Sequence, residues 1–308
     1  YSHIYPHRKS LMDMMFRLLF FFTFFALGLF GLAYSASALT VAPVRQTIVV
    51  DPGTETSVSL FVVNDTDAPM KLLPLVESFS LENTTGKTVF GTPEDALSWI
   101  GPNQESGPLS SGRHGEFTFS LRVPEDTPPG GHYIVLFAQE VHGSGQVGLG
   151  ARVGSLLFLH VSGTIQELAQ VTAFSSLKKV YIHAPPTISF ALQNRGNIHI
   201  TPIGDITVST FWGNTFHTIP LTANRKILPG GAWEETVVVP DIPFWVVGKV
   251  RATLTATYGA TEQPLAQQVS FWIISWQMIL VFVFICTSGG VVAARVVGNK
   301  QKKKKFIV

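Results

Sequence analysis

A stretch of 19 residues from Trp276 to Ala294 contains no charged side chain. A helix of about 20 apolar residues is long enough to cross the roughly 30 Å hydrocarbon layer of a membrane. Trp272 and Trp276 stand at one edge of the stretch and Arg295 stands at the other, and both residue types favour the headgroup zone. We therefore expect a single transmembrane helix at residues 272–297.

Basic residues are concentrated behind this stretch. Six Lys and Arg residues and no acidic residue follow residue 271, whereas residues 39–271 contain 13 basic and 19 acidic residues. Basic residues beside a membrane span mark its cytoplasmic side, so residues 298–308 are expected to form a cytoplasmic tail and residues 39–271 to lie outside the membrane. The tail includes Lys302–Lys305, but a nucleic-acid-binding protein would carry a basic face on its folded body. We expect no nucleic-acid partner.

A second apolar run lies near the start of the sequence. It follows Arg17 and ends in small residues, among which Ala36 and Ala38 fit the A-x-A pattern of a signal-peptidase site. Residues 1–38 are therefore expected to contain a signal peptide cleaved after Ala38, preceded by upstream read-through residues, with initiation at Met12, Met14 or Met15. The alternative is an uncleaved anchor helix.

The single cysteine, Cys286, falls inside the expected membrane span. A disulfide within the chain is excluded, so the outer domains must rely on hydrophobic cores. A reactive thiolate is also implausible in lipid, because catalytic cysteines sit in electropositive, partly exposed surroundings.

Residues 39–271 alternate between apolar and polar side chains, which is typical of half-buried β-strands. The alternation is clearest in three segments: TETSVSLFVVN from Thr54, GEFTFSLRVP from Gly115 and KVRATLTATYG from Lys249. Turns rich in Pro and Gly, such as DPG and TPPGG, separate such segments. Many short strands with regular turns indicate an all-β fold of the sandwich type.

The pattern occurs twice along the chain. VSLFVVN ends at Asn64 and ISFALQN ends at Asn194; each half also has a strand that ends at a proline, with a glycine seven or eight residues later that opens the next strand. This repeat predicts two tandem immunoglobulin-like β-sandwiches, at residues 39–163 and 164–271, each near the size that such a domain needs. One larger sandwich is the alternative.

The first half has a longer middle segment, residues 92–115. PEDALSWI predicts a short helix there, with Asp95 near its start and Trp99 packed into the core. The remainder of the segment is expected to be loop.

Two glycine-containing motifs have structural and ligand-binding interpretations. GSGQVGLG matches G-x-G-x-x-G from Gly143 to Gly148, but a dinucleotide site needs a helix directly afterwards, and the next segment alternates like a strand. A hairpin loop is expected. NRGNIHITPIGD is expected to form a tight turn that requires positive φ at Asn194, Gly196 and Asn197, rather than a ligand loop.

Catalytic, cofactor-binding and metal-binding residues are not expected. The nine histidines form no H-E-x-x-H motif, and those after residue 38 form no close pair with a helical or strand spacing; no G-x-S-x-G motif occurs either. Asn64 and Asn83 stand in N-x-T sequons, which matter only in a host that glycosylates them. Three pairs of adjacent acids lie next to turn residues and are expected to be solvated, because neighbours on a strand point to opposite faces: Glu94–Asp95, Glu125–Asp126 and Glu234–Glu235.

The segments VAPVRQTIVVDPGTETSVSLFVVNDTDAPMKL, VPEDTPPGGHY and GARVGSLLFLHVSG resemble the first domain of bacterial WxL-interacting cell-surface proteins. QNRGNIHITPIGD and FWIISWQ look like the membrane-proximal domain of similar proteins. The resemblance implies a surface-anchored, non-enzymatic role, with the first domain on cell-wall polymer and the second on a partner surface protein. More loosely, the N-terminal half resembles periplasmic pilus chaperones, which also pair two immunoglobulin-like domains.

Three functions are therefore open from the sequence. The first is a non-enzymatic, single-pass surface protein that binds a partner protein or cell-wall polymer through its sandwiches, since exposed strand edges accept an added strand. The second is a membrane-tethered chaperone or an accessory subunit of a secretion or surface-assembly system. The third is a hydrolase whose site is assembled from distant loops. No cofactor is expected for the first two.

Overall fold

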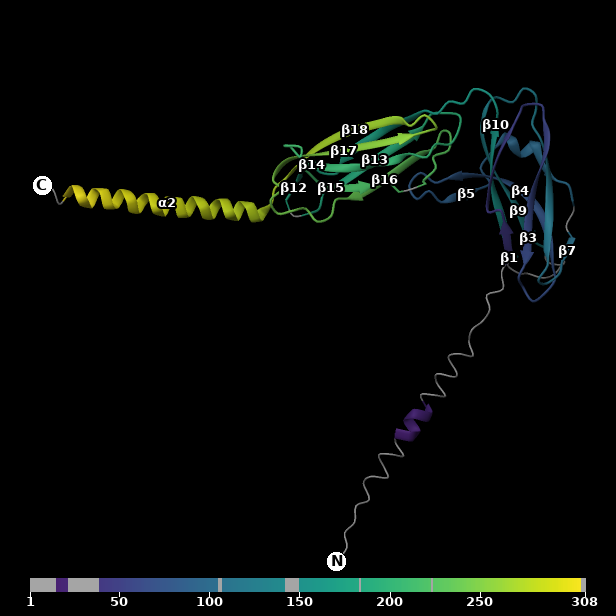
Figure 1. The fold of residues 1–308 in the computed structure, drawn as a ribbon, viewed down its shortest axis with the longest axis horizontal. Coiled ribbons are helices and arrows are strands. Elements are labelled where there is room, and N and C mark those ends of the chain that lie inside the picture. The colour runs from purple at the N-terminus through teal and green to yellow at the C-terminus, as the bar shows by residue number, and fades with distance from the viewer. Residues whose placement is uncertain are drawn as a thin grey trace, which may run out of the picture.

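The structure, a computed structural model, describes residues 15–21, 39–104, 107–141, 150–182, 184–222 and 224–305. Residues 15–21 are helical. The described strands form two pairs of sheets, and one long helix leaves the far end of the second pair (Figure 1). The fold is all-β, as the alternating pattern predicted. The expected signal-peptidase site and most of the glycine-rich loop lie outside the described residues.

The first sandwich is built from Leu39–Val161. Its smaller sheet has the strand order β1(Leu39–Ala42), β3(Glu55–Asn64), β8(His114–Arg122), β6(Ile100–Pro102). Its larger sheet has the order β2(Arg45–Val50), β10(Arg152–Val161), β9(Gly130–Glu140), β4(Met70–Leu81), β5(Thr88–Phe90), and β7(Gly107–Leu109) also pairs with β4. The chain thus changes sheets between β1 and β2.

The second sandwich is built from Ala169–Ile273. Its smaller sheet has the order β11(Ala169–Ser176), β13(Thr187–Asn194), β16(Ala232–Val238). Its larger sheet has the order β12(Val180–Tyr181), β18(Gln263–Ile273), β17(Gly248–Tyr258), β14(Ile203–Thr210), β15(Thr215–Pro220). The division of the chain into domains at residues 163 and 164 stays a prediction.

The alternating residues of the sequence face the two cores. On β3 they are Val58, Leu60 and Val62, and on β17 they are Val250, Ala252, Leu254, Ala256 and Tyr258; all are buried. Burying one such large side chain contributes about 1.5–3 kcal/mol. Without disulfides, these two cores hold the sandwiches together, as the cysteine usage implied.

The repeat predicted at Asn64 and Asn194 recurs in three dimensions. Both side chains are fully buried, and each side-chain amide donates to two backbone carbonyls, one on the turn that follows and one on a segment distant in the sequence. Each side-chain oxygen accepts from the backbone N–H two residues later. The two halves therefore end equivalent strands with the same hydrogen-bonded turn.

The middle segment of the first half differs in part from the expectation. PEDALSWI does form one short helix, η1(Asp95–Trp99), of the 3-10 type, and Trp99 is partly buried against the first core. The segment expected as loop contains two strands, β6 and β7. These three-residue strands were missed because they are too short to show an alternating pattern.

The C-terminal helix α2(Trp276–Lys305) contains a stretch, Trp276–Arg295, that is long and apolar enough to cross a membrane, with none of that stretch buried against the rest of the protein. The helix begins later than residue 272, because Trp272 and Ile273 are the last residues of strand β18. They still pair with β17 on one side and β12 on the other. It also runs past residue 297 into the lysine-rich tail.

Candidate functional site: a groove between the sandwiches

The larger sheet of the first sandwich is apolar on both of its faces. Alternate residues of β9 point into the core, and the residues between them join a second apolar cluster on the outer face, made of Phe79, Tyr133, Val135, Phe137 and Phe158. Leu228 of the second sandwich completes this cluster. Because an apolar face must be covered, the second sandwich docks on this outer face.

The turn between β4 and β5 makes the first contact between the sandwiches. The backbone oxygen of Asn83 accepts hydrogen bonds from the Glu234 backbone N–H at 2.8 Å and from the Arg225 guanidinium at 2.5 Å. The side-chain oxygen of Asn83 accepts from the Ala232 N–H at 3.0 Å, and Arg225 also donates to the Thr84 carbonyl at 3.0 Å. The backbone and side-chain oxygens of this sequon asparagine therefore hold the two sandwiches together.

Asn197 makes the second contact. Its side-chain amide donates to the carbonyls of Pro129 at 2.9 Å and Thr164 at 3.0 Å, and its side-chain oxygen accepts from the Gln166 N–H at 2.7 Å. Its backbone oxygen accepts from the Gly131 N–H at 2.8 Å. One side chain thus ties together the first sandwich, the connecting segment and the second sandwich.

The turn expected at Asn194, Gly196 and Asn197 is present, but the predicted positive φ is wrong. Among the described residues, none of these three has a left-handed φ. Gly196 is required for a different reason: a Cβ atom at this position would lie 2.1 Å from the backbone oxygen of Gln166. The glycine therefore permits the close approach of the connecting segment that Asn197 holds in place.

A groove with a cavity volume of about 340 Å³ lies beside the first of these contacts, and Asn83, Arg225 and Ala232 are in its lining. Tyr133 and Leu228 contribute an apolar floor, and charged side chains from both sandwiches stand around it: Glu82, Glu94, Arg225 and Lys226. The wall is a mixture of loops and strand ends, so its residues lie far apart in the sequence. Such a groove can bind a partner segment, with the apolar floor supplying contact area and the charges selecting the segment.

Four basic side chains meet next to the groove. Lys226 Nζ donates to His199 Nε2 at 2.8 Å, and the rings of His199 and His160 lie 5.3 Å apart. Arg45 and Lys226 both lie over the ring of Phe158, at 5.2 Å and 5.4 Å from its centroid. Within the described residues, no hydrogen bond or ion pair joins any of the four to a carboxylate.

Burial and neighbouring positive charges lower the pKa values of three side chains in this basic cluster. Burial, and then the positive charges of Lys226, His160 and Arg45, lower the pKa of His199 to about 3. Burial followed by the charge of Lys226 lowers the pKa of His160, and burial followed by the charge of Arg45 lowers the pKa of Lys226. The cluster therefore has a positive potential that an anionic group would relieve.

Lowering the pH should reduce the free energy of unfolding, because His199 of this cluster resists protonation in the folded state. The unfolded chain protonates His199 below about pH 6.5 while the folded chain resists protonation down to about pH 3, so stability is lost as the pH falls through this window. After allowance for partial exposure, we expect a loss of the order of 1–2 kcal/mol between pH 7 and pH 4 from this residue. Urea unfolding across this range measures it. His199→Gln should flatten the pH dependence, whereas His114→Gln, at an exposed position, should leave it unchanged; equal curves for both variants would contradict the assignment.

The paired acids were expected to be solvated, and for Glu94 this is wrong. Its carboxylate is half-buried at 2.7 Å from His132 Nδ1, and the His132 ring packs edge to face against Trp99. Glu235 accepts a hydrogen bond from Trp233 Nε1 at 2.8 Å. These carboxylates support the architecture around the groove.

The other sequence candidates give no catalytic arrangement. In the described part of the chain, no group of three or more His, Cys, Asp or Glu side chains is placed to hold a metal ion. The sequence could not show that His160 and His199 meet across the two sandwiches, because 38 residues separate them along the chain and their rings lie 5.3 Å apart. Their only sequence signal is that each follows or lies near the end of an apolar strand.

Comparisons with known proteins give limited information. No protein-family model matches the chain, and no curated protein matches it. The WxL-interacting resemblance is therefore not shown.

Similar solved structures include the class 5 fimbriae chaperone CfaA, at 12% identity over 75% of this chain and 98% of that chain with a TM-score of 0.44. They also include the complex of the Salmonella enterica SafA pilin with the SafB chaperone, at 12% identity, 77% and 99% coverage and a TM-score of 0.39, and the E. coli chaperone DraB, at 15% identity, 75% and 98% coverage and a TM-score of 0.36. These matches agree with the looser of the two resemblances seen in the sequence, and at such scores they carry no argument about function.

Proposed function

We propose that the protein is a non-enzymatic, single-pass membrane protein whose two sandwiches stand outside the membrane and bind an acidic segment of a partner. The partner would be a surface protein or a charged cell-wall polymer, as the resemblance to WxL-interacting proteins implies. The lysine-rich tail would lie in the cytoplasm.

The observation that carries the proposal is the basic cluster of Arg45, Lys226, His160 and His199 beside the groove, at the junction of two sandwiches that are hydrogen-bonded to each other. Arg45 and Lys226 offer several N–H donors, and the described structure gives Arg45 no hydrogen-bonded or ion-paired partner of its own. Charge-assisted bonds to a carboxylate or phosphate are about twice as strong as neutral ones. The adjacent groove, with Tyr133 and Leu228 in its lining, offers an apolar surface beside these cations.

Membrane attachment rests on α2. Its apolar stretch is not covered by the sandwiches, and its flanking tryptophans and lysines have the distribution expected of a span whose C-terminal end is cytoplasmic. Attachment would hold the groove on the outer side, where it meets exported proteins and wall polymers.

Reversing the charge of the basic cluster should strongly reduce partner binding. The double variant Arg45→Glu with Lys226→Glu should lower the recovery of crosslinked partner from intact cells at least about tenfold, because two charge-assisted contacts become repulsive. Quantitative mass spectrometry of proteins and glycans crosslinked to the full-length chain measures this recovery. The control is Lys71→Glu with Arg113→Glu, which changes the net charge equally at exposed positions of the first sandwich. Equal recovery with both double variants would overturn the assignment of the groove.

The alternative, a membrane-tethered chaperone or accessory subunit, is favoured by the open edge of β2. In the described structure β2 pairs with β10 alone, and Thr47 and Val49 are exposed on it. An edge of this kind accepts an added strand. Arg45 is itself the first residue of β2, so the discriminating variant is Lys226→Glu alone. Crosslinks at Thr47 or Val49 that survive this single change would support this function instead.

A further inference from the structure

The end of the second sandwich from which α2 leaves carries three apolar loops. Strand register places them together: Thr210 pairs with Val250 near the start of β17, and Gly248 pairs with Ile273 at the end of β18. In the other sheet Thr187 pairs with Val238. Three segments, called loops below, therefore emerge at the end where α2 begins: the described part of 177–186, which also contains β12, the turn 211–214 and the loop 239–247.

Exposed apolar side chains gather at this end. Within the described part of residues 169–275, Ile203 is the one exposed large hydrophobic side chain that lies elsewhere. Trp212, at the tip of the β14–β15 turn, is 85% exposed. We call the set the aromatic end: Leu177, Val180, Ile182, Phe211, Trp212, Val238, Phe244, Trp245, Val247, Trp272 and Trp276. Exposed apolar patches of this extent mark an interaction surface.

The link to α2 is too short to let this surface move away from the helix. Only Ile274 and Ser275 separate β18 from α2, and two residues span at most about 7 Å. Both are also held, since the Ile274 N–H donates to the Tyr181 carbonyl at 2.8 Å and the Ser275 hydroxyl to Gln277 at 2.7 Å. Whatever surrounds the first turn of α2 therefore also meets the three loops.

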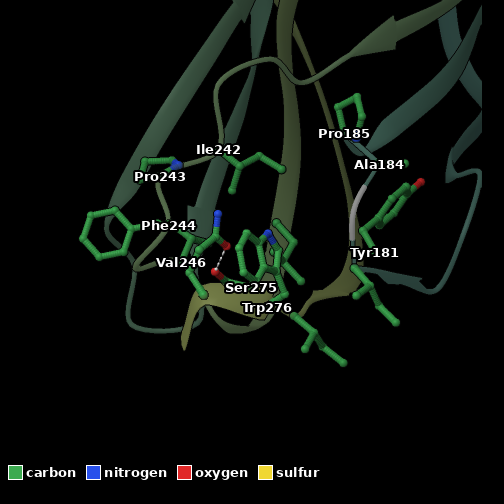
Figure 2. Close-up of a pocket in the computed structure, with 13 residues that line it drawn as sticks. Tyr181, Ala184, Pro185, Ile242, Pro243, Phe244, Val246, Ser275 and Trp276 are labelled. Carbon is green, nitrogen blue, oxygen red and sulfur yellow. Dashed lines mark hydrogen bonds between the residues drawn. The ribbon is translucent and has the colours of Figure 1, made fainter. Parts of the chain in front are cut away.

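Three side chains of the aromatic end, Ile182, Phe244 and Trp276, border a cavity of about 270 Å³ at the base of the helix. Figure 2 shows Trp276 between the loop that carries Pro243, Phe244 and Val246 and the segment that carries Tyr181 and Pro185. The first residue of α2 is thus part of the sandwich surface. The apolar surface of the helix therefore adjoins that of the loops.

The chemistry of the aromatic end matches a lipid headgroup layer. It holds Trp212, Trp245, Trp272 and Trp276, four of the six tryptophans of the chain, and tryptophan prefers the membrane interface. Three exposed lysines lie among these residues and could neutralise anionic lipid: Lys178, Lys179 and Lys249. Asp241 is the acid of the same loops, so the net charge of this end is positive.

We infer that the aromatic end is a lipid-contacting surface, seated in the headgroup layer of phospholipids around α2. This inference rests on the proposed membrane span. It makes the second sandwich a base that stands on the membrane, with the three loops inserted at the level of the interfacial tryptophans. Its partner is the bilayer surface itself, not a second protein.

The test uses the full chain with Cys286→Ser, reconstituted in vesicles of phosphatidylcholine and phosphatidylglycerol. Trp212→Cys and, separately, Phe244→Cys place an environment-sensitive fluorophore in two of the three loops. Ile203→Cys is the matched control, since it is exposed and apolar but lies seven residues along β14, about 23 Å farther from this end. A nitroxide attached near the lipid headgroup should quench the fluorophore at 212 and 244 about fivefold more than at 203. Quenching at 212 and 244 no greater than at 203 would overturn the inference.

Two measurements separate this result from the behaviour of the span. Flotation of the vesicles, followed by carbonate washing, reports whether α2 holds the chain in the membrane. A chain that floats and resists washing but shows no lipid quenching at 212 and 244 would support the membrane span. The same result would contradict lipid contact by the aromatic end. Protection of both positions from aqueous iodide without lipid quenching would assign the aromatic end to a protein contact, such as a second copy, and would also overturn it.

Discussion

Ending the chain after Ser275 should move the protein from the membrane fraction to the soluble fraction completely. The stretch Trp276–Arg295 is the one membrane-length apolar helix among the described residues, and the sandwiches bury none of it. Transfer of about 20 apolar residues into lipid is effectively irreversible, whereas surface contacts of the aromatic end are not. Carbonate extraction followed by immunoblotting of both fractions measures the shift.

The control for this truncation replaces the stretch Trp276–Arg295 with an unrelated uncharged apolar sequence of the same length, which should keep the chain in the membrane. The mass of the truncated chain must be determined as well, because an uncleaved N-terminal apolar run would also retain it. A truncated chain that has lost residues 1–38 and still resists carbonate would contradict the role of α2. Protease added to intact cells should remove the sandwiches of the full chain and spare the lysine-rich tail.

Replacing either buried turn asparagine should cause the largest loss of stability among single changes outside the apolar cores. Asn194→Ala removes donors to the carbonyls of Ile198 and Ile227, at 2.7 Å and 2.8 Å, and the acceptor of the Gly196 N–H. The carbonyls and the N–H then stay buried without these partners, which costs about 1–3 kcal/mol for each unsatisfied group. Partial relaxation reduces the sum, and we expect about 3 kcal/mol from urea unfolding of the detergent-solubilised chain.

Matched variants test whether the buried side-chain amide is the cause of the lost stability. Asn64→Ala should cost the first sandwich a similar amount, because Asn64 makes equivalent bonds to Ala68 and Leu109. Asn194→Asp keeps the shape but points a carboxylate at two carbonyls, so it should be at least as destabilising as the alanine variant. Asn214→Ala, at an exposed turn, should change little. A loss below about 1 kcal/mol for Asn194→Ala would show that water or a rearranged turn replaces the amide.

Local patterns in the sequence were sufficient to predict much of the fold. The alternation in β3, β8 and β17 arises because each strand has one face in a core, and every second residue of the strand must therefore be apolar. The repeated asparagine at Asn64 and Asn194 was also visible, since both halves use the same turn. By contrast, β6 and β7 depend on pairing with distant strands and leave no pattern of their own.

The groove could not be predicted because its parts are distant in the sequence. Asn83 and Arg225, and likewise His160 and His199, meet only when the second sandwich covers the outer face of β9 and β10. The one usable signal was on β9 itself: HYIVLFAQ does not alternate, and a strand that is apolar on both sides needs cover on both sides. Gly196 shows the same limit, because its requirement is set by Gln166 from the connecting segment and not by its own backbone angle.

The hydrogen bonds of Asn83 and Asn197, together with the two-residue link to α2, fix the distance between the helix and the groove. They leave the molecule without a hinge between the helix and the groove, so the second sandwich acts as a rigid spacer. Its strand β17 has 11 residues, a length of about 36 Å at 3.3 Å per residue. If α2 spans the membrane and the protein binds an acidic segment as proposed, a partner fixed to the same membrane must present that segment at about this height above the membrane surface. A partner whose segment lies closer to the membrane or farther from it would not reach the groove.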